Sequence, residues 1–452
     1  MQNKLKRNNF IQTIILVIIL ILFAIYIIYT IYISLENEKI IEIIDKNQLS
    51  DLKITILDED LEKIYSDPTK EEYISVDVII NGKEFKNCGF RTKGSSGYEV
   101  VQESEKPTRF GYRLELDYFV DNQSYDGVSK FYINNGMLDK TYIKEMIGFD
   151  IYEKAGVKTP KRSLCELTIN EKNEGIYTIV EVADDEFIER EYGNLDGIIY
   201  KTKVSIEQGV YELVYDGDDF NNYPEIMNCE KFGKEFTKKD MQNLVKSIEM
   251  VSKNENIEEY VDIDATIDYF VASFFIKNDD SYVSVSSRNY YVYQIGQKIT
   301  LLPYDLNLYF RFKNSINATV LFFDTYNNNP ENKPLIYNIL NNSVYQEQYK
   351  EKMRNLIEEI EKEDYINKRI DVYANLIDEA AKNSNNFYTY EEFQKAIPAF
   401  KNVFERRMNS VKKQLDANEN YAYIEYEDEM GEDLYLISDF SYLKDDWVYW
   451  HK

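Results

Sequence analysis

The hydrophobic pattern of the chain begins with a long apolar run. Residues 11–33 are almost continuously apolar, with only three polar interruptions. This run exceeds the roughly 20 residues that cross a bilayer. A cleaved signal peptide has a shorter apolar core, and it is followed by a cleavage motif of small residues. This run is longer than such a core, and no such motif follows it. We therefore predict a transmembrane anchor at residues 10–33.

The charges around this run predict its orientation. Lys4, Lys6 and Arg7 precede it without any acidic residue. Basic residues stay on the cytoplasmic side of a membrane, so residues 1–9 should be cytoplasmic. The rest of a single-pass protein would then lie on the far side, beginning with a polar, helical stalk at 34–50.

The first half of the remaining chain alternates as β-strands do. Runs rich in β-branched and aromatic residues, with Asn81-Gly82 as a hairpin turn, predict strands at 52–57, 73–82, 83–94, 112–117, 162–169 and 176–181. In 112–117, apolar side chains face one side and charged side chains the other. One helix is predicted, at 139–155, ending before Gly156.

The second half has mostly helical spacing. We predict helices within 235–276 and 333–415, with a short strand pair at 289–293 and 298–302. This order predicts an α+β fold with a strand-rich N-terminal lobe and a mainly helical C-terminal lobe, spanning 51–415 and preceded by one transmembrane helix. The tail, 416–452, is acidic and aromatic, and its pattern fits either a docked arm or a solvated tail.

Composition narrows the chemistry. The net charge is −27, and because the first 33 residues carry three positive charges, the remainder carries −30. This charge disfavours nucleic acid as a partner, because phosphates attract the opposite sign, and we expect none. The single histidine, His451, is next to last, which excludes Ser-His-Asp and Cys-His catalysis and His-ligated zinc. The three cysteines are widely spaced and form no CxxC pair, so we interpret them as small buried hydrophobic residues.

One ordered set of polar residues remains suited to catalysis. Asp280 follows a predicted helix, Asn289 starts a predicted strand, and Asp305 follows the returning strand. Phosphoryl transfer needs one carboxylate to orient the attacking hydroxyl, and an Asn with a second carboxylate to hold Mg²⁺. The alternative is that they are surface and turn residues, which a chain with 80 acids supplies freely.

Eight short segments form an ordered series along the chain: RTKGSSG (91–97), GVSKFYINNG (127–136), INEKNEGIYTIVE (169–181), GIIYK (197–201), NDDS (278–281), NYYVY (289–293), LPYDLN (302–307) and PLIYNIL (334–340). In sequence and in order, this series resembles the CotH-type atypical protein kinases of spore coats and bacterial surfaces. The resemblance covers about residues 52–312. It implies a two-lobed, kinase-like fold that uses ATP with Mg²⁺ or Mn²⁺ to phosphorylate Ser residues of coat or surface proteins.

The resemblance also implies roles for single residues. Asp280 corresponds to the catalytic Asp near the substrate hydroxyl, and Asn289 and Asp305 to the metal ligands. Glu181 ends a strand that looks like the kinase hinge, where backbone groups meet adenine; an ordinary acid at a strand end explains its side chain equally well.

The ATP-binding residues depart from the family pattern. The family strand aligned with 112–116 is often rich in lysine, whereas here Arg113 would bind phosphate, or else Lys106 or Arg109. Glu145 on the predicted helix would be the partner acid. The segment 91–97, which includes Arg91 and Ser95, would contact phosphates through backbone N–H groups, unless it is a plain hairpin turn.

Three functions fit these observations. The first is a membrane-anchored Ser kinase, in a spore-coat or forespore setting, acting on basic, Ser-rich proteins that complement its acidity. The second is a catalytically inactive scaffold with the same fold, used in coat or surface assembly. The third is an unrelated carboxylate hydrolase such as a glycosidase, in which the 40 tyrosines would supply sugar platforms.

Overall fold

Seven strands of the first half close into a barrel. The computed structural model describes residues 26, 44–94, 97–201, 212–284, 287–311, 315–321, 329, 331–417 and 431–439. The barrel order is β1-β2-β3-β4-β5-β7-β6. Its strands are β1 (Leu49–Thr55), β2 (Ile74–Ile80), β3 (Lys83–Lys93), β4 (Gly111–Glu115), β5 (Lys130–Asn134), β6 (Arg162–Ile169) and β7 (Lys172–Glu181).

The barrel closes through one long-range pairing. β1 pairs with β6 in parallel, with Leu52 opposite Leu167, whereas the neighbouring strands pair antiparallel. The short helices α2 (Asp58–Ser66) and α3 (Tyr98–Glu103) lie between barrel strands in the chain. Local alternation predicted most of these strands, but it carries no information on a parallel partner more than 100 residues away.

The charged side of β4 is buried, like its apolar side. Leu114 is fully buried, and Arg113 and Glu115 on the other face are only 5% and 8% exposed. The reason is tertiary: Arg113 extends to Glu230, which belongs to a second sheet. This strand is therefore covered on both faces.

The second sheet has four antiparallel strands in the order β11-β10-β8-β9. These are β8 (Gly197–Lys201), β9 (Glu230–Gly233), β10 (Tyr290–Ile295) and β11 (Lys298–Pro303). The predicted hairpin of β10 and β11 is confirmed, and β8 and β9 extend it. Tyr290 pairs with Pro303, so the chain enters β10 and leaves β11 at the same end of the sheet.

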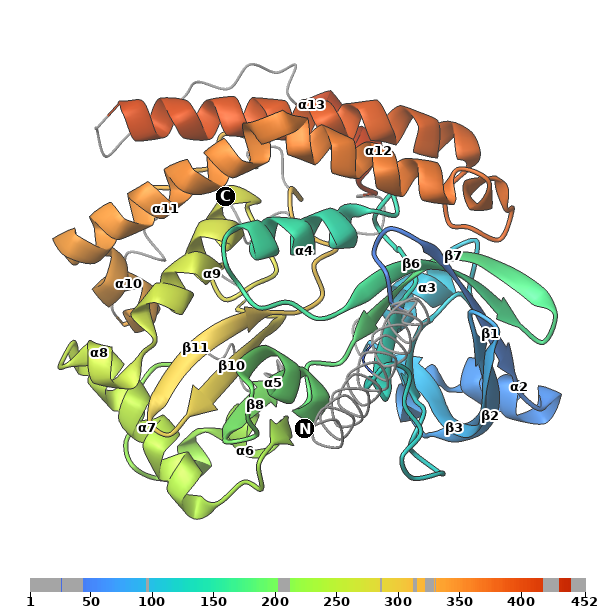
Figure 1. The fold of residues 1–452 in the computed structure, drawn as a ribbon, viewed down its shortest axis with the longest axis horizontal. Coiled ribbons are helices and arrows are strands. Elements are labelled where there is room, and N and C mark those ends of the chain that lie inside the picture. Colours follow the sequence, from blue (N-terminus) through green and yellow to red (C-terminus); the bar gives the residue numbers. More distant parts are fainter. Residues whose placement is uncertain are drawn as a thin grey trace, which may run out of the picture. The chain divides into compact units, whose positions relative to one another are not determined.

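Helices dominate the second half, as predicted, with shorter bounds. The helices that follow β5 are α4 (Lys144–Lys154), α5 (Asp185–Tyr192), α6 (Pro224–Met227), α7 (Lys238–Lys253), α8 (Ile257–Tyr260), α9 (Ile263–Phe275), α10 (Pro334–Leu340), α11 (Ser343–Glu361), α12 (Tyr365–Ile377), α13 (Tyr390–Asp416) and α14 (Gly431–Ile437). In Figure 1 the long helices α11, α12 and α13 run along one side, with α4 between them and the sheets. The predicted mixed α+β class is confirmed.

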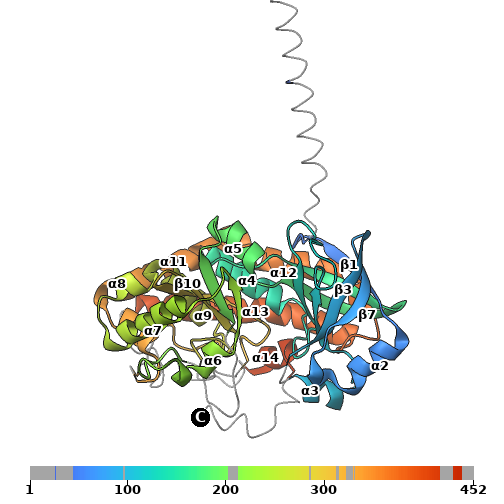
Figure 2. The same ribbon diagram turned by 90° about the horizontal axis from the view of Figure 1, so that it is seen from below.

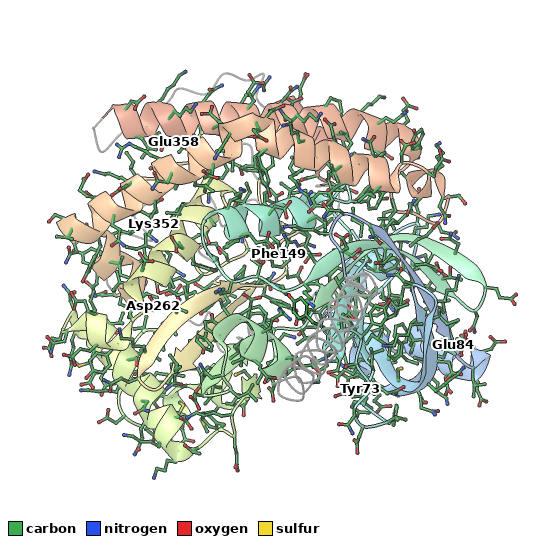
Figure 3. The ribbon with its side chains drawn as sticks, viewed as in Figure 1. Tyr73, Glu84, Phe149, Asp262, Lys352 and Glu358 are labelled. Carbon is green, nitrogen blue, oxygen red and sulfur yellow. The ribbon has the colours of Figure 1, made fainter. Side chains whose placement is uncertain are left out.

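Helix α4 lies in the core of this arrangement. It contacts α9, α11 and α12, and its Phe149, labelled in Figure 3, is 1% exposed. The buried Asp150 accepts hydrogen bonds from Arg162 of β6 (2.5 Å), Arg369 of α12 (2.9 Å) and Tyr373 of α12 (2.9 Å). These contacts from the barrel and from α12 hold α4 in place.

The predicted helix at 139–155 starts late, at Lys144. The Asp139 carboxylate accepts hydrogen bonds from the backbone N–H groups of Thr141 and Lys144, both at 2.9 Å. Asp139 thus satisfies the N–H groups of a turn that leads into the helix, in the manner of other Asx turns. The first five predicted helical residues belong to this turn.

Part of the acidic tail is a docked arm. Helix α14 packs against α13 (Figure 2), and its Leu434 and Ile437 are buried. The Lys140 N–H donates to the Ile437 carbonyl at 3.1 Å, so the arm also contacts the turn before α4. Residues 418–430 and 440–452 lie outside the described part of the chain.

The chain divides into two units, Met1–Asp45 and Lys46–Lys452. Apart from Tyr26, the predicted anchor at 10–33 lies outside the described residues, as does the stalk up to residue 43. No helix within the described ranges has the length and apolar character needed to cross a bilayer. The three cysteines are buried, as predicted.

Candidate active site

Three chain segments meet beyond the end of the second sheet. Asp280 follows α9, Asn289 precedes β10 and Asp305 follows β11. The Asn289 side-chain amide donates to the Asp280 carboxylate at 2.8 Å. A bridge between Asn278 and Tyr309 joins the first segment to the third. The segments of Asp280, Asn289 and Asp305, which form an ordered set in the sequence, are therefore also close in space.

The backbone of this cluster is in an uncommon conformation. Asn289 and Asp305 have φ values of 46° and 54°, in the left-handed region. Asn and Asp tolerate this region better than most residues, but it still has a conformational cost. Such conformations persist where the surrounding structure determines them, and they concentrate at functional sites.

The charged groups around Asp280 have opposite effects on its pKa. Burial raises the pKa of Asp280 to about 6; Arg311 and Arg288 act against this rise, while Asp305 and Asp279 add to it. A pKa near neutrality is the property that a carboxylate needs to accept and release a proton. Asp280 is also only 7% exposed, which limits competition from water.

Lys93, the last residue of β3, reaches Asp305 from the barrel. Its ammonium donates to the Asp305 carboxylate at 2.9 Å and to the Asn134 side-chain oxygen at 2.7 Å. Burial alone would lower the pKa of Lys93, but the charges of Asp305 and Glu145 outweigh this, and the pKa is raised. Lys93 is therefore a charged group within the cluster.

Glu145 on α4 completes this network. Both of its carboxylate oxygens accept from the Asn134 amide, at 2.9 and 2.8 Å. Burial and the charge of Asp305 raise the pKa of Glu145 to about 7, against the opposing effect of Lys93. Gly148 lets α4 approach Leu306 and Tyr309, which follow Asp305 in the chain. A Cβ at position 148 would lie 3.0 Å from the Tyr309 ring and 3.2 Å from Leu306.

The donor set suits a hard divalent cation. Asp280, Asn289 and Asp305 offer oxygen atoms, which Mg²⁺ and Mn²⁺ prefer. Asp305 raises the pKa of Asp280, and a cation between the two carboxylates would relieve this repulsion. Among the described residues, no three Asp, Glu, Cys or His side chains are grouped as a metal site. Two protein carboxylates with an amide fit an ion that also takes water and phosphate as ligands.

The other predicted residues have structural partners of their own. Arg113 forms ion pairs with Glu115 and Glu230, both at 2.7 Å. Arg91 binds Glu71 at 2.6 Å and the Thr92 carbonyl at 3.0 Å. The structure thus places both arginines in ion pairs on the barrel, and Ser95 lies outside the described residues.

Glu181 and the two alternative cations also have structural partners. The Glu181 carboxylate binds Arg190 of α5 and accepts from the Lys161 N–H at 2.8 Å. Lys106 donates to the Ser384 carbonyl at 2.6 Å. Arg109 is buried and donates to the backbone carbonyls of Glu174 and Ile176. None of these contacts joins Glu181, Lys106 or Arg109 to Asp305.

Sequence reasoning missed Lys93 and Asn134. Both stand inside segments that carried the family resemblance, RTKGSSG and GVSKFYINNG. The available signal was position, since each is the polar last residue of a barrel strand. β3 and β5 are separated only by β4 in the barrel, so their ends meet at the same edge.

Comparisons with known proteins point to one family. A family model described as "CotH kinase protein" matches residues 90–411. The chain is also similar to the inner spore coat protein H of Bacillus subtilis (strain 168), with 21% identity over 193 residues. This match covers 41% of the chain and 51% of the relative, so the chain spans about half the length of that relative.

Proposed function

The chain belongs to the CotH kinase protein family, and from this premise we propose that it is a protein serine kinase that transfers the γ-phosphate of ATP. The observation that carries the proposal is the joining of Lys93, Asp305 and Glu145 beside the Asp280–Asn289 hydrogen bond. A lysine on a barrel strand, an acid on the adjoining helix and a metal-binding Asp are the parts of a two-lobed, kinase-like site.

Each residue has a role in this proposal. Asp280 accepts the proton of the substrate hydroxyl, which its raised pKa favours. Asp305 and Asn289 hold Mg²⁺ or Mn²⁺, which neutralises phosphate charge when bound. Lys93 binds phosphate in the role first predicted for Arg113, and Asn134 connects it to Glu145.

The remaining assignments extend the proposal. The apolar run at 10–33 anchors the protein in a membrane, with residues 1–9 cytoplasmic and the kinase domain on the far side. The net charge of −27 favours basic, Ser-rich substrates. The similarity to an inner spore coat protein supports coat proteins as those substrates. Glu181 is already paired with Arg190, so it contacts adenine through backbone groups. Arg91 is already paired with Glu71, so its segment contacts phosphate through backbone groups.

The test is phosphotransfer by the full-length protein in detergent. With ATP and Mg²⁺ or Mn²⁺, wild type should phosphorylate itself or a basic, Ser-rich protein, and Asp305→Asn should reduce the rate at least about a hundredfold. Asp371→Asn, at an exposed position of α12, is the matched control and should retain full activity. If wild type and Asp305→Asn are equally inactive with both metals while folded, the catalytic proposal fails and the scaffold function is favoured.

A further inference from the structure

A second lysine, Lys201, approaches the same aromatic rings as Lys93 from the opposite sheet. Lys201 is the last residue of β8, whereas Lys93 ends β3 of the barrel. The Lys201 ammonium lies 4.8 Å from the ring centroid of Tyr132 and 5.1 Å from that of Tyr304. The corresponding distances for Lys93 are 4.9 and 5.3 Å.

These distances bring the two positive charges together. Because each ammonium lies about 5 Å from the same Tyr132 centroid, the two are within about 10 Å of each other. Their side chains are 10% and 13% exposed, so both are largely covered, and a small part of each side chain is open to solvent. Charge interactions are stronger in such a partly buried place than in water.

The local partners of Lys201 leave much of its binding capacity unused. Among the described residues, its ammonium donates one hydrogen bond, to the Tyr132 hydroxyl at 2.9 Å. The Glu230 carboxylate is 3.9 Å away, and the same carboxylate oxygen is engaged by Arg113 at 2.7 Å. A lysine ammonium has three donors, so Lys201 can bind an incoming anion without losing a strong partner.

The position of Lys201 is fixed by the sheet and by a cluster of tyrosines. On β8 it pairs with Tyr291 of β10 and Glu230 of β9. The Tyr304 ring lies 5.1 Å from that of Tyr291 and 5.5 Å from that of Tyr132. Tyr304 directly precedes Asp305, so the cluster places Lys201 beside the proposed metal ligand.

We propose that Lys201 is a second phosphate-binding residue, which together with Lys93 makes the site select nucleoside di- and triphosphates over monophosphates and nucleosides. Lys93 contacts Asp305 and binds the phosphate nearest the transferred group, and Lys201 binds the remaining part of the polyphosphate chain. Two compact ammonium groups at this spacing match a chain of charges better than a single phosphate. The inference rests on the proposed function, because it assigns the selectivity of that same site.

The test measures binding rather than transfer. Full-length protein in detergent is titrated with ATP, ADP, AMP and adenosine in the presence of Mg²⁺, using wild type, Lys201→Met, Lys201→Arg and the control Lys298→Met. Lys298 is an exposed lysine of β11 in the same sheet. Lys201→Met should weaken ATP and ADP binding about ten- to hundredfold, as expected for one hydrogen bond to a charged group. Adenosine and AMP binding should change less than about threefold, Lys201→Arg should retain most of the ATP affinity, and Lys298→Met should match wild type.

The possible results separate the inference from the proposed function. Equal weakening of ATP and adenosine binding by Lys201→Met, or no weakening of either, overturns the inference. Absence of nucleotide binding by wild type overturns both the inference and the proposed function. Selective loss of ATP and ADP binding in a protein that transfers no phosphate supports the inference and refutes the kinase activity. If Lys201→Met does not fold, as judged by its unfolding transition without ligand, the comparison is made with Lys201→Gln, which can keep the hydrogen bond to Tyr132.

Discussion

Replacing Lys93 by Met tests which cation of the barrel serves the reaction. The structure places the Lys93 ammonium 2.9 Å from Asp305, whereas Arg113 is paired with Glu115 and Glu230. Methionine keeps most of the side-chain volume and removes the charge. The substitution should therefore act on the chemistry of the site more than on packing.

The expected size of the effect of Lys93→Met follows from the contacts of the Lys93 ammonium with Asp305 and Asn134. Loss of one fixed donor that stabilises developing charge lowers kcat about 10²- to 10³-fold, or about 3–4 kcal/mol of activation free energy. The loss of stability should be smaller, about 1–3 kcal/mol, because the Asp305 side chain is 22% exposed and can regain water. Lys93→Met should therefore be folded and nearly inactive.

The assay compares the steady-state phosphotransfer rates of Lys93→Met, Arg113→Met and the control Lys298→Met, each with its denaturant unfolding curve. Lys93→Met should lose at least about a hundredfold in kcat, and Arg113→Met should lose less activity. A Lys93→Met protein within threefold of wild type, beside an inactive but folded Arg113→Met protein, would refute the reasoning and return the role to Arg113.

Two further predictions concern stability. Leu434→Ala, in the docked helix α14, should lower the free energy of unfolding by about 2–5 kcal/mol in denaturant titrations, because the Leu434 side chain is 1% exposed; a change below about 0.5 kcal/mol would contradict docking of the arm. Burial opposes ionisation of Glu153, but Arg162 and Lys46 outweigh it and lower the pKa of Glu153 from its ordinary 4.5 to about 2. Because the pKa of Glu153 is lower in the folded state, this stabilisation is complete above about pH 4.5 and is lost as the pH falls toward 2. Glu153→Gln should therefore flatten the dependence of the unfolding free energy on pH between these values. An unchanged slope would contradict the assignment.

The sequence alone determined the elements whose signal is local. The alternation of strands, the β10–β11 hairpin and the helical second half all follow from the spacing of neighbouring residues. The single histidine restricted the chemistry to groups such as carboxylates, and the ordered motifs indicated the family that the match over residues 90–411 confirms. The set of Asp280, Asn289 and Asp305 was also predictable, since the two strands between Asn289 and Asp305 form a hairpin that returns the chain to the same end.

Only the tertiary structure decided which cation meets Asp305. Alternation placed Arg113 on the charged face of its strand, but the partner of that face, Glu230, lies 117 residues further along the chain. Lys93 reaches Asp305 across 212 residues, through closure of the barrel and the approach of the second sheet. Local periodicity indicates which face of a strand or helix a side chain occupies. The identity of a distant partner depends on long-range packing, about which local periodicity carries no information.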